Sequence, residues 1–238
     1  MSASSVHLIE TPASGRLVLR APGGDRVTGL LVGFHGYAES ADAQLQRMTG
    51  LPELDDWLLV SVQALNRFYR GRSTETVASW MTRHDREAMI AVNIGYVDRA
   101  VDWVRKTFKV GVAESAKGDS PPTPRTLLLY AGFSQGVAMA FRAAVRGRWT
   151  ADGLIAVGGD VPPELLTDPD ARFSRILLAR GVRDDWYTQE KLDADVDALT
   201  ARGARVTPLV FDGGHEWPSS ISAPVAKFVR SCTADPRS

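Results

Sequence analysis

Residues 126–136 read TLLLYAGFSQG, and this stretch decides the fold class. The unbroken apolar run from Thr126 to Ala131 is typical of a strand that is buried on both faces of a parallel sheet. The alanine-rich segment from Gln135 to Arg146 suits a helix. A glycine-bounded turn joins the two. Strand, tight turn and helix in this order predict one unit of an α/β sheet, whose turn lies at the carboxyl edge where ligands bind.

The rest of the chain repeats this alternation. Short apolar runs predict buried strands at Leu30–Phe34, Trp57–Val62, Gly153–Val157, Ile176–Ala179 and Val206–Phe211. Apolar residues at helical spacing predict helices at Glu87–Phe108, Gln189–Arg202 and Pro224–Ser231. Arg16–Arg20 favours an antiparallel edge strand, and the proline-containing segment 111–125 a surface loop. The link from Val157 to Arg175 is too short for a cap domain. We expect a single domain over residues 1–238, built on a mostly parallel sheet with helices on both faces.

The composition argues against several classes of protein. Of the 238 residues, 44% are hydrophobic, 28 are basic and 28 are acidic, so no net field favours nucleic acid or an anionic membrane as a partner. No apolar run approaches the roughly 18 residues of a transmembrane helix. The N-terminal stretch MSASSVHLIETPAS lacks the features of a secretory signal, and the lone Cys232 cannot form an internal disulfide. We expect a cytoplasmic protein in which Cys232 is an ordinary packed or surface residue; the sequence leaves the oligomeric state open.

The turn after the central strand carries the pattern Gly-x-Ser-x-Gly, from Gly132 to Gly136. A serine on a sharp strand-to-helix turn holds its hydroxyl clear of the sheet. Side chains two positions to either side would collide with the neighbouring strand and helix, and the glycines remove them. The helix that begins at Gln135 points free amides toward developing negative charge. The context predicts that Ser134 is a nucleophile.

A serine nucleophile needs a base, and histidine is the usual one. The four histidines are His7, His35, His84 and His215. His7 lies in the N-terminal stretch and His84 among charged residues, while His35 at a strand end is better placed to brace its loop. His215 follows Gly213-Gly214 after the last expected strand, where the loop can bring an imidazole back over the sheet edge. Elimination therefore favours His215.

The base in turn needs a carboxylate that fixes its tautomer. Asp184 and Asp185 both follow the strand that ends near Gly181, and Asp160 follows the strand that ends at Val157. The spacing alone leaves these three aspartates open.

Catalysis by acyl transfer also needs two donors for an oxyanion. The amide of Gln135, directly after the candidate nucleophile, is one candidate. The turn Phe34-His35-Gly36-Tyr37 follows an earlier strand, and it offers the amide of Tyr37 as the other.

Four motifs together resemble the phospholipase/carboxylesterase family, which includes the acyl-protein thioesterases. They are Phe34-His35-Gly36, the Gly-Phe-Ser-Gln-Gly core at 132–136, Gly181-x-x-Asp184 and Gly214-His215, and the resemblance runs from about Leu30 to Val229. It implies the α/β-hydrolase fold and hydrolysis of small-molecule carboxylic esters or thioesters without a metal or cofactor. It also selects Asp184 over Asp185, and it matches the oxyanion donors to Tyr37 and Gln135.

The long segment 63–84 is the expected rim of the site. Its aromatic and sulfur side chains, Phe68, Tyr69, Trp80 and Met81, are candidate substrate-binding residues, and its arginines could meet an anionic group. The same side chains could equally pack the loop down or face solvent. Two alternatives to an esterase or thioesterase stay open: a peptidase on the same fold, and a binding protein without catalysis.

Overall fold

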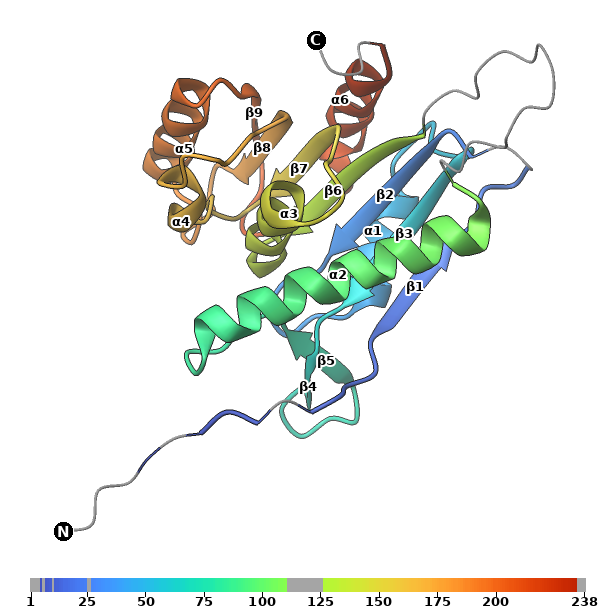
Figure 1. The fold of residues 1–238 in the computed structure, drawn as a ribbon. Helices are drawn as coiled ribbons and strands as arrows, with labels where there is room; N and C mark the ends of the chain where they lie inside the picture. The colour runs from blue at the N-terminus through green and yellow to red at the C-terminus, as the bar shows by residue number, and fades with distance from the viewer. Residues whose placement is uncertain (1–4, 6, 10, 25–26, 111–125, 235–238) are drawn as a thin grey trace.

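The computed structural model describes residues 5, 7–9, 11–24, 27–110 and 126–234, and its centre is a seven-stranded sheet (Figure 1). The strands lie in the order β1 (Arg16–Arg20), β3 (Trp57–Gln63), β2 (Gly29–Phe34), β6 (Leu127–Phe133), β7 (Gly153–Val157), β8 (Arg175–Gly181) and β9 (Arg205–Phe211). All neighbouring pairs are parallel except β1 and β3, which run antiparallel. The predicted parallel sheet and its antiparallel edge are confirmed.

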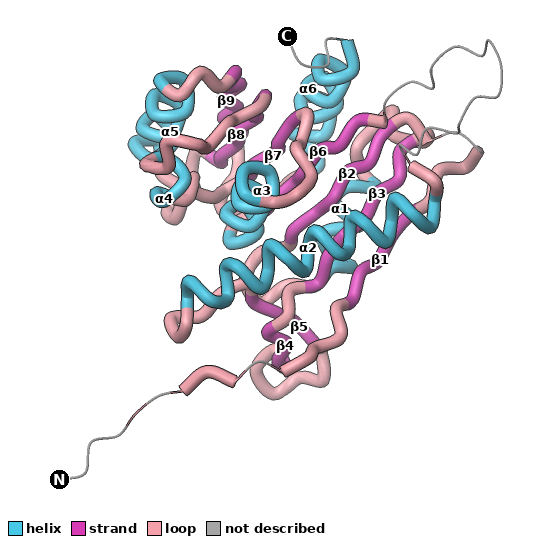
Figure 2. The backbone as a smooth tube through the Cα atoms, viewed as in Figure 1, coloured by secondary structure: helices cyan, strands magenta, loops and turns pink. Residues whose placement is uncertain are grey.

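Helices cover both faces of this sheet, as predicted for the α/β class (Figure 2). They are α1 (Ala41–Thr49), α2 (Arg86–Phe108), α3 (Gln135–Arg146), α4 (Pro163–Leu166), α5 (Gln189–Ala201) and α6 (Ser222–Ala234), with a 3₁₀ turn at Ser219–Ile221. Apolar side chains of α2, α3 and α5 share one core cluster, and those of α1 and α6 pack into another. The link between β7 and β8 contains only the four-residue α4, so no cap covers the carboxyl edge.

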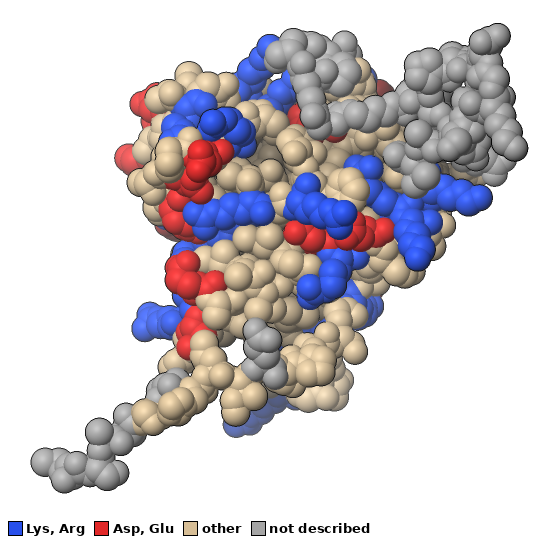
Figure 3. Space-filling model, in the orientation of Figure 1, with Lys and Arg blue, Asp and Glu red and all other residues tan. Residues whose placement is uncertain are grey.

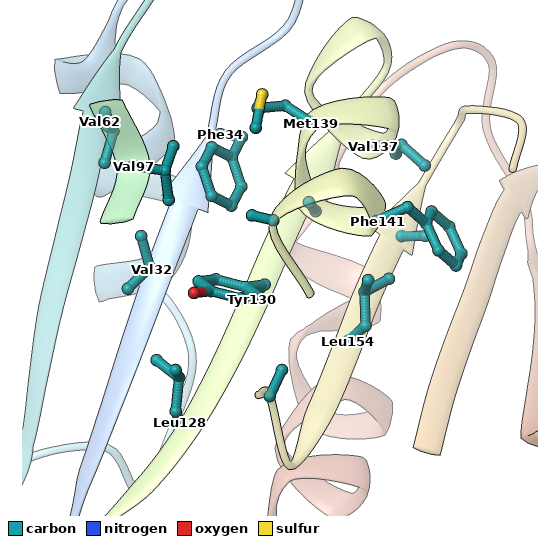
Figure 4. Packing of buried hydrophobic residues seen from close by; sticks show 14 of the residues in the cluster. Val32, Phe34, Val62, Val97, Leu128, Tyr130, Val137, Met139, Phe141 and Leu154 are labelled. Carbon is teal, nitrogen blue, oxygen red and sulfur yellow. The ribbon is translucent and has the colours of Figure 1, made fainter. Parts of the chain in front are cut away.

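The central strands alternate between the two cores because successive side chains of a strand point to opposite faces. In β6, Leu128 and Tyr130 join the cluster beneath α2 and α3 (Figure 4), whereas Leu129 and Phe133 join the cluster on the other face. Each such residue is buried, and full burial of a Leu or Phe side chain contributes about 1.5–3 kcal/mol. Because both faces are buried, nearly every residue of the central strands is apolar.

The last strand departs from the expectation. Val206–Phe211 was expected to be buried, but β9 lies at the sheet edge, and within it only Phe211 is buried. Pro208 lacks an amide hydrogen, and an edge strand tolerates this because one of its sides pairs with no other strand.

Several short elements were not expected, among them α1 and a hairpin; α4 and the 3₁₀ turn are others. Helix α1 follows Ser40, whose hydroxyl accepts from the amide of Ala43 at 3.3 Å. Within segment 63–84, β4 (Asn66–Tyr69) and β5 (Thr76–Ser79) form an antiparallel hairpin rather than a loop. Each of these elements is nine residues long or shorter, and a hairpin is stable only when it docks on other elements. Such elements carry a weak periodic signal.

Remaining expectations concern charge, membranes and the cysteine. On the face shown in Figure 3, basic and acidic side chains are interspersed. Several charges of opposite sign form ion pairs, such as Arg148 with Asp102 at 3.0 Å. Among the residues described, no helix combines the length and apolar character needed to cross a bilayer. Cys232 is packed in the core, where burial raises the pKa of its thiol to about 11. The expected surface loop at 111–125 lies outside the described residues.

Candidate active site

The backbone of the turn between β6 and α3 is strained at Ser134, and the two glycines beside it are needed for close packing. Ser134 has φ 52° and ψ −120°, in a region that residues other than glycine rarely adopt and that costs of order 1–3 kcal/mol. A Cβ on Gly132 would lie 2.5 Å from the carbonyl oxygen of Gly136. A Cβ on Gly136 would lie 2.1 Å from the carbonyl oxygen of Phe34. Only glycine at both positions lets α3 begin this close to the neighbouring strand.

Three side chains from different parts of the chain form a continuous hydrogen-bonded line. The Oγ of Ser134 lies 2.8 Å from Nε2 of His215, and Nδ1 of the same ring lies 2.9 Å from Oδ2 of Asp184. An ionised carboxylate can only accept, so the Nδ1 facing it carries the proton. Nε2 is then left as the acceptor that faces the serine hydroxyl.

The carboxylate of Asp184 is buried and held as an anion. Its Oδ1 accepts the amides of Trp186 at 2.9 Å and Tyr187 at 3.0 Å. Burial opposes ionisation, but the hydrogen bonds from Tyr187, His215 and Trp186 outweigh it and hold the pKa of Asp184 below its ordinary value. This carboxylate therefore stays charged through the neutral range.

The other sequence candidates lie elsewhere. Asp185 is exposed, and Asp160 forms an ion pair with Lys191 at 3.1 Å rather than with a histidine. His7 and His84 are both exposed at the surface. The geometry thus brings only one of the three candidate aspartates to His215.

His35 braces its loop, as expected. It is fully buried; Nδ1 donates to the carbonyl of Gly36 at 2.7 Å, and Nε2 accepts the amide of Ala64 at 3.1 Å. Burial lowers the pKa of His35, which favours the neutral ring that this pattern needs.

The loop that carries Asp184 is clamped by residues that sequence reasoning missed. Arg180 is buried and donates to the carbonyl of Tyr187 at 2.9 Å and to Oε1 of Gln189 at 3.0 Å. The hydroxyl of Tyr187 donates to Asp195 at 3.0 Å, and burial raises the pKa of Asp195. A buried arginine inside a strand is the signal that could have pointed to this clamp, because an ion of this kind is rarely buried without partners.

The imidazole of His215 is held between an aromatic ring and a glycine. The Phe133 ring lies 5.2 Å from it, centroid to centroid. Gly158 has φ +66°, and a Cβ there would come within 3.2 Å of the imidazole Cε1 and 3.3 Å of Asp184 Oδ2. The His215 loop is tied to the Asp184 loop by a hydrogen bond from the Arg183 amide to the Gly213 carbonyl at 2.9 Å. This hydrogen bond helps to fix the position of one loop relative to the other.

The two candidate oxyanion donors lie on fixed turns. Tyr37 is flanked by Gly36, whose amide donates to Glu39 at 2.8 Å, and by Ala38, whose amide donates to Ala78 at 3.0 Å. The amides of Tyr37 and Gln135 have no hydrogen-bond partner in the part of the chain that the structure describes. Unpaired amides on fixed turns are the kind of donor that can stabilise a developing negative charge.

The Gln135 side chain links the turn that carries Ser134 to the end of the β4–β5 hairpin. Its Oε1 accepts the amide of Trp80 at 2.8 Å, and its Nε2 donates to the carbonyl of Met81 at 3.3 Å. The indole of Trp80 is 1% exposed and donates to the carbonyl of His35 at 3.0 Å. Trp80 thus supports the turn after β2 from beneath and does not face a ligand.

Ser134 and His215 line an open groove with a volume of about 300 Å³. Its other lining residues are Arg86, Gln135, Ala138, Arg142, Gly158, Gly159, Asp160, Val161, Pro162, Pro163, Trp186 and Lys191. None of the four rim candidates is among them. Trp80 is buried, Tyr69 is 66% exposed, the Phe68 ring packs tilted against that of Tyr37 with 5.8 Å between centroids, and the carbonyl of Met81 accepts from Gln135. The four residues therefore do not line this groove, and a role for them in binding substrate remains a prediction.

The arginines of segment 63–84 also lie outside this groove. Arg67 donates to the carbonyl of Ser14 at 2.7 Å, and Arg70 donates to that of Ala38 at 2.8 Å. Sequence reasoning found Ser134, Gln135 and His215 but missed Trp186 and the three basic residues of the lining, Arg86, Arg142 and Lys191. Trp186 follows the candidate acid by two positions, which is a usable signal. The basic residues stand on three separate helices, and no sequence pattern joins them.

A cavity of about 320 Å³ lies at the opposite edge of the sheet, near the starts of β7 and β8. Its lining includes Asp152, Arg172 and Phe173 but none of the serine, histidine or aspartate residues described above. We place the candidate site at the groove, because the reactive side chains meet there.

Comparison with known proteins gives structural matches only; no protein-family model and no curated protein sequence matches the chain. Esterase PE8 aligns with a TM-score of 0.71 at 18% identity, over 92% of this chain and 100% of its own. Acyl-protein thioesterase 2 of Zea mays aligns with a TM-score of 0.68 at 18% identity, over 92% of this chain and 99% of its own. A phospholipase/carboxylesterase from Dyadobacter fermentans aligns with a TM-score of 0.64 at 18% identity, over 92% and 97%. These similarities establish the α/β-hydrolase fold.

Proposed function

We propose that this chain is a serine hydrolase that cleaves carboxylic ester or thioester bonds through an acyl-enzyme. The observation that carries the proposal is the line from Ser134 Oγ to His215 Nε2 at 2.8 Å, and from His215 Nδ1 to Asp184 Oδ2 at 2.9 Å. The strained turn of the serine and the esterases and thioesterases that share the fold support the same reading.

In the proposed reaction, Ser134 Oγ attacks the carbonyl carbon while Nε2 of His215 takes the hydroxyl proton. The carbonyl oxygen becomes an oxyanion, to which the amides of Tyr37 and Gln135 donate. The imidazolium is stabilised by the Asp184 carboxylate, and its Nε2 proton goes to the departing alkoxide or thiolate. Water then enters, gives a proton to His215 and attacks the acyl carbon. Collapse of this second intermediate releases the acid and returns the proton to Ser134.

A fluorophosphonate probe and one pair of variants test the proposal. The probe should label the protein at Ser134, and Ser134→Ala should remain folded, lose labelling and lose at least about 10⁴ in hydrolysis of p-nitrophenyl and thioester substrates. Ser220→Ala, at an exposed serine outside the groove, should keep both activities. Unchanged turnover in Ser134→Ala would refute the mechanism. Cleavage of amino-acid p-nitroanilides without cleavage of esters would indicate a peptidase instead, and neither labelling nor turnover would indicate a binding protein.

A further inference from the structure

The groove beside Ser134 has an unusual balance of charge. Three of its lining side chains are basic, Arg86, Arg142 and Lys191, and one, Asp160, is acidic. The bases come from α2, α3 and α5, so three separate helices place cations on one small groove. The remaining walls are largely apolar, formed by Ala138, Val161, Pro162, Pro163 and Trp186.

Two of the three cations are fixed by partners. Lys191 Nζ lies 3.1 Å from Asp160 and donates to the Trp186 carbonyl at 2.7 Å. Arg142 is 2% exposed, and its Nε and one terminal nitrogen both bind Oε1 of Glu164, at 2.8 and 2.7 Å. Both nitrogens meet a single carboxylate oxygen, so the guanidinium is anchored at one side while it still lines the groove.

Arg86 is different, because its position is not explained by the helix that carries it. It is the first residue of α2, where the helix dipole disfavours a positive charge. Its ion-pair partner among the described residues is Glu87, at 3.7 Å, and the Glu87 side chain is 82% exposed. An exposed pair at this distance contributes little. Burial lowers the pKa of the Arg142 guanidinium, Glu164 opposes this, and the charge of Arg86 lowers it further, so the two arginines repel each other. The Glu164 carboxylate is attracted to both, because burial raises its pKa but the charges of Arg142 and Arg86 each lower it.

We propose that this groove binds a carboxylate that the substrate carries, with Arg86 as its main partner and Arg142 beside it. The proposal deepens the proposed function and rests on it: the substrate is a short ester or thioester with a second, anionic end. Guanidinium groups bind carboxylates through paired, charge-assisted hydrogen bonds. The apolar walls fit the short chain that separates the anion from the scissile carbonyl. A volume of about 300 Å³ lies at the small end of ligand pockets, which span roughly 300–1,000 Å³.

The carboxylate could stand on the acyl half or on the leaving group, and two matched pairs of esters distinguish these sources. For the acyl half, mono-p-nitrophenyl adipate is compared with p-nitrophenyl hexanoate, which replaces the carboxylate by a methyl group. For the leaving group, 4-carboxyphenyl hexanoate is compared with 4-carbamoylphenyl hexanoate. We expect kcat/KM to be about tenfold higher for the anionic member of at least one pair. Added salt should reduce this preference, because it screens the charges.

Arg86→Gln should lower the anionic-to-neutral ratio of kcat/KM to near one. Arg99→Gln is the matched control, since it removes the same charge from an exposed position of the same helix outside the groove. It should leave the ratio unchanged. An equal effect in the two variants would overturn the proposal, because it would show a general effect of charge rather than a site.

Failure of this inference is distinguishable from failure of the proposed function. Ready hydrolysis of the neutral esters with no preference in either pair would overturn the carboxylate site and leave the hydrolase standing. Absence of all hydrolysis would refute the proposed hydrolase activity. The carboxylate site would then be tested by measuring binding. Calorimetry with adipamate, the monoamide of adipate, and with neutral hexanamide should show tighter binding of adipamate that Arg86→Gln removes. Equal binding of the two amides would overturn the site on this route as well.

Discussion

Replacement of Asp184 by asparagine should abolish most activity without unfolding the protein, and the structure says how the new side chain must lie. Oδ1 of Asp184 accepts two backbone amides, from Trp186 at 2.9 Å and Tyr187 at 3.0 Å. The amide nitrogen of an asparagine is a donor and cannot occupy that position. The oxygen must therefore stay with the two amides, and the nitrogen must take the place of Oδ2.

That orientation places an N–H donor 2.9 Å from Nδ1 of His215. Nδ1 then faces this donor at 2.9 Å and the oxygen Oδ1 at 3.1 Å. The nearer donor favours Nδ1 as an acceptor, so the ring proton moves to Nε2, which faces Ser134 Oγ at 2.8 Å. A protonated Nε2 cannot take the serine proton, and the stabilising negative charge is lost as well. In a comparable triad the same change costs about 10⁴ in kcat. At about 1.36 kcal/mol for each factor of ten, this corresponds to roughly 5.5 kcal/mol of transition-state stabilisation.

The assay is kcat with a p-nitrophenyl ester, with circular dichroism and urea unfolding to confirm the fold. Asp185→Asn is the control, because Asp185 is the exposed neighbour and should lose about tenfold at most. A folded Asp184→Asn variant with near-normal kcat would refute the reasoning. A large loss confined to Asp185→Asn would reverse the assignment, and normal values for both would direct attention to Asp160.

Three other variants test the surroundings of the site. Gly158→Ala should lower the free energy of unfolding by about 1–2 kcal/mol, because a φ of +66° is strained for alanine. It should also lower kcat, because the new Cβ would lie 3.2 Å from the His215 ring. Urea unfolding and turnover measure the two effects, and full activity would contradict the close approach. Arg180→Met leaves the Tyr187 carbonyl without its donor and should lower the free energy of unfolding by about 1–3 kcal/mol. The loss of kcat should be smaller than in Asp184→Asn. Unchanged stability would argue that Arg180 does not hold the Asp184 loop in place. The buried His35 has a lowered pKa in the folded state, so its contribution to stability is present above the ordinary value of 6.5 and is lost as the pH falls through the folded-state pKa. His35→Gln should therefore flatten the fall of unfolding free energy as the pH drops below 6.5, and an unaltered pH profile would show that His35 is not its source.

The sequence predicted the features that depend on near neighbours in the chain. The strand, turn and helix around Ser134 follow from an apolar run, two glycines and an alanine-rich segment. The structure shows why, since a Cβ at Gly136 would meet the carbonyl of Phe34 at 2.1 Å. The parallel sheet followed from runs of apolar residues long enough to be buried on both faces. Elements with a weaker local signal were missed, among them α1 and the β4–β5 hairpin.

The hydrogen-bonded line from Ser134 through His215 to Asp184 is only partly predictable from the sequence. Residues and a family resemblance selected Asp184 and His215, but the distance between them depends on how the loops after β8 and β9 meet. The burial of Trp80 is likewise a tertiary outcome. Its aromatic ring suggested a wall for substrate, whereas the docked hairpin turns it under the His35 loop.

The sequence by itself therefore determined the fold class, the sharp turn at Ser134 and a small set of candidate histidine and aspartate partners for that serine. Each of these depends on residues that lie close together along the chain. What only the tertiary structure decided is which distant groups share the groove. Arg86, Arg142 and Lys191 stand on three helices and become neighbours only when these pack on the sheet. Electrostatic interactions depend on separation in space, and a linear sequence does not contain that separation until the chain has folded.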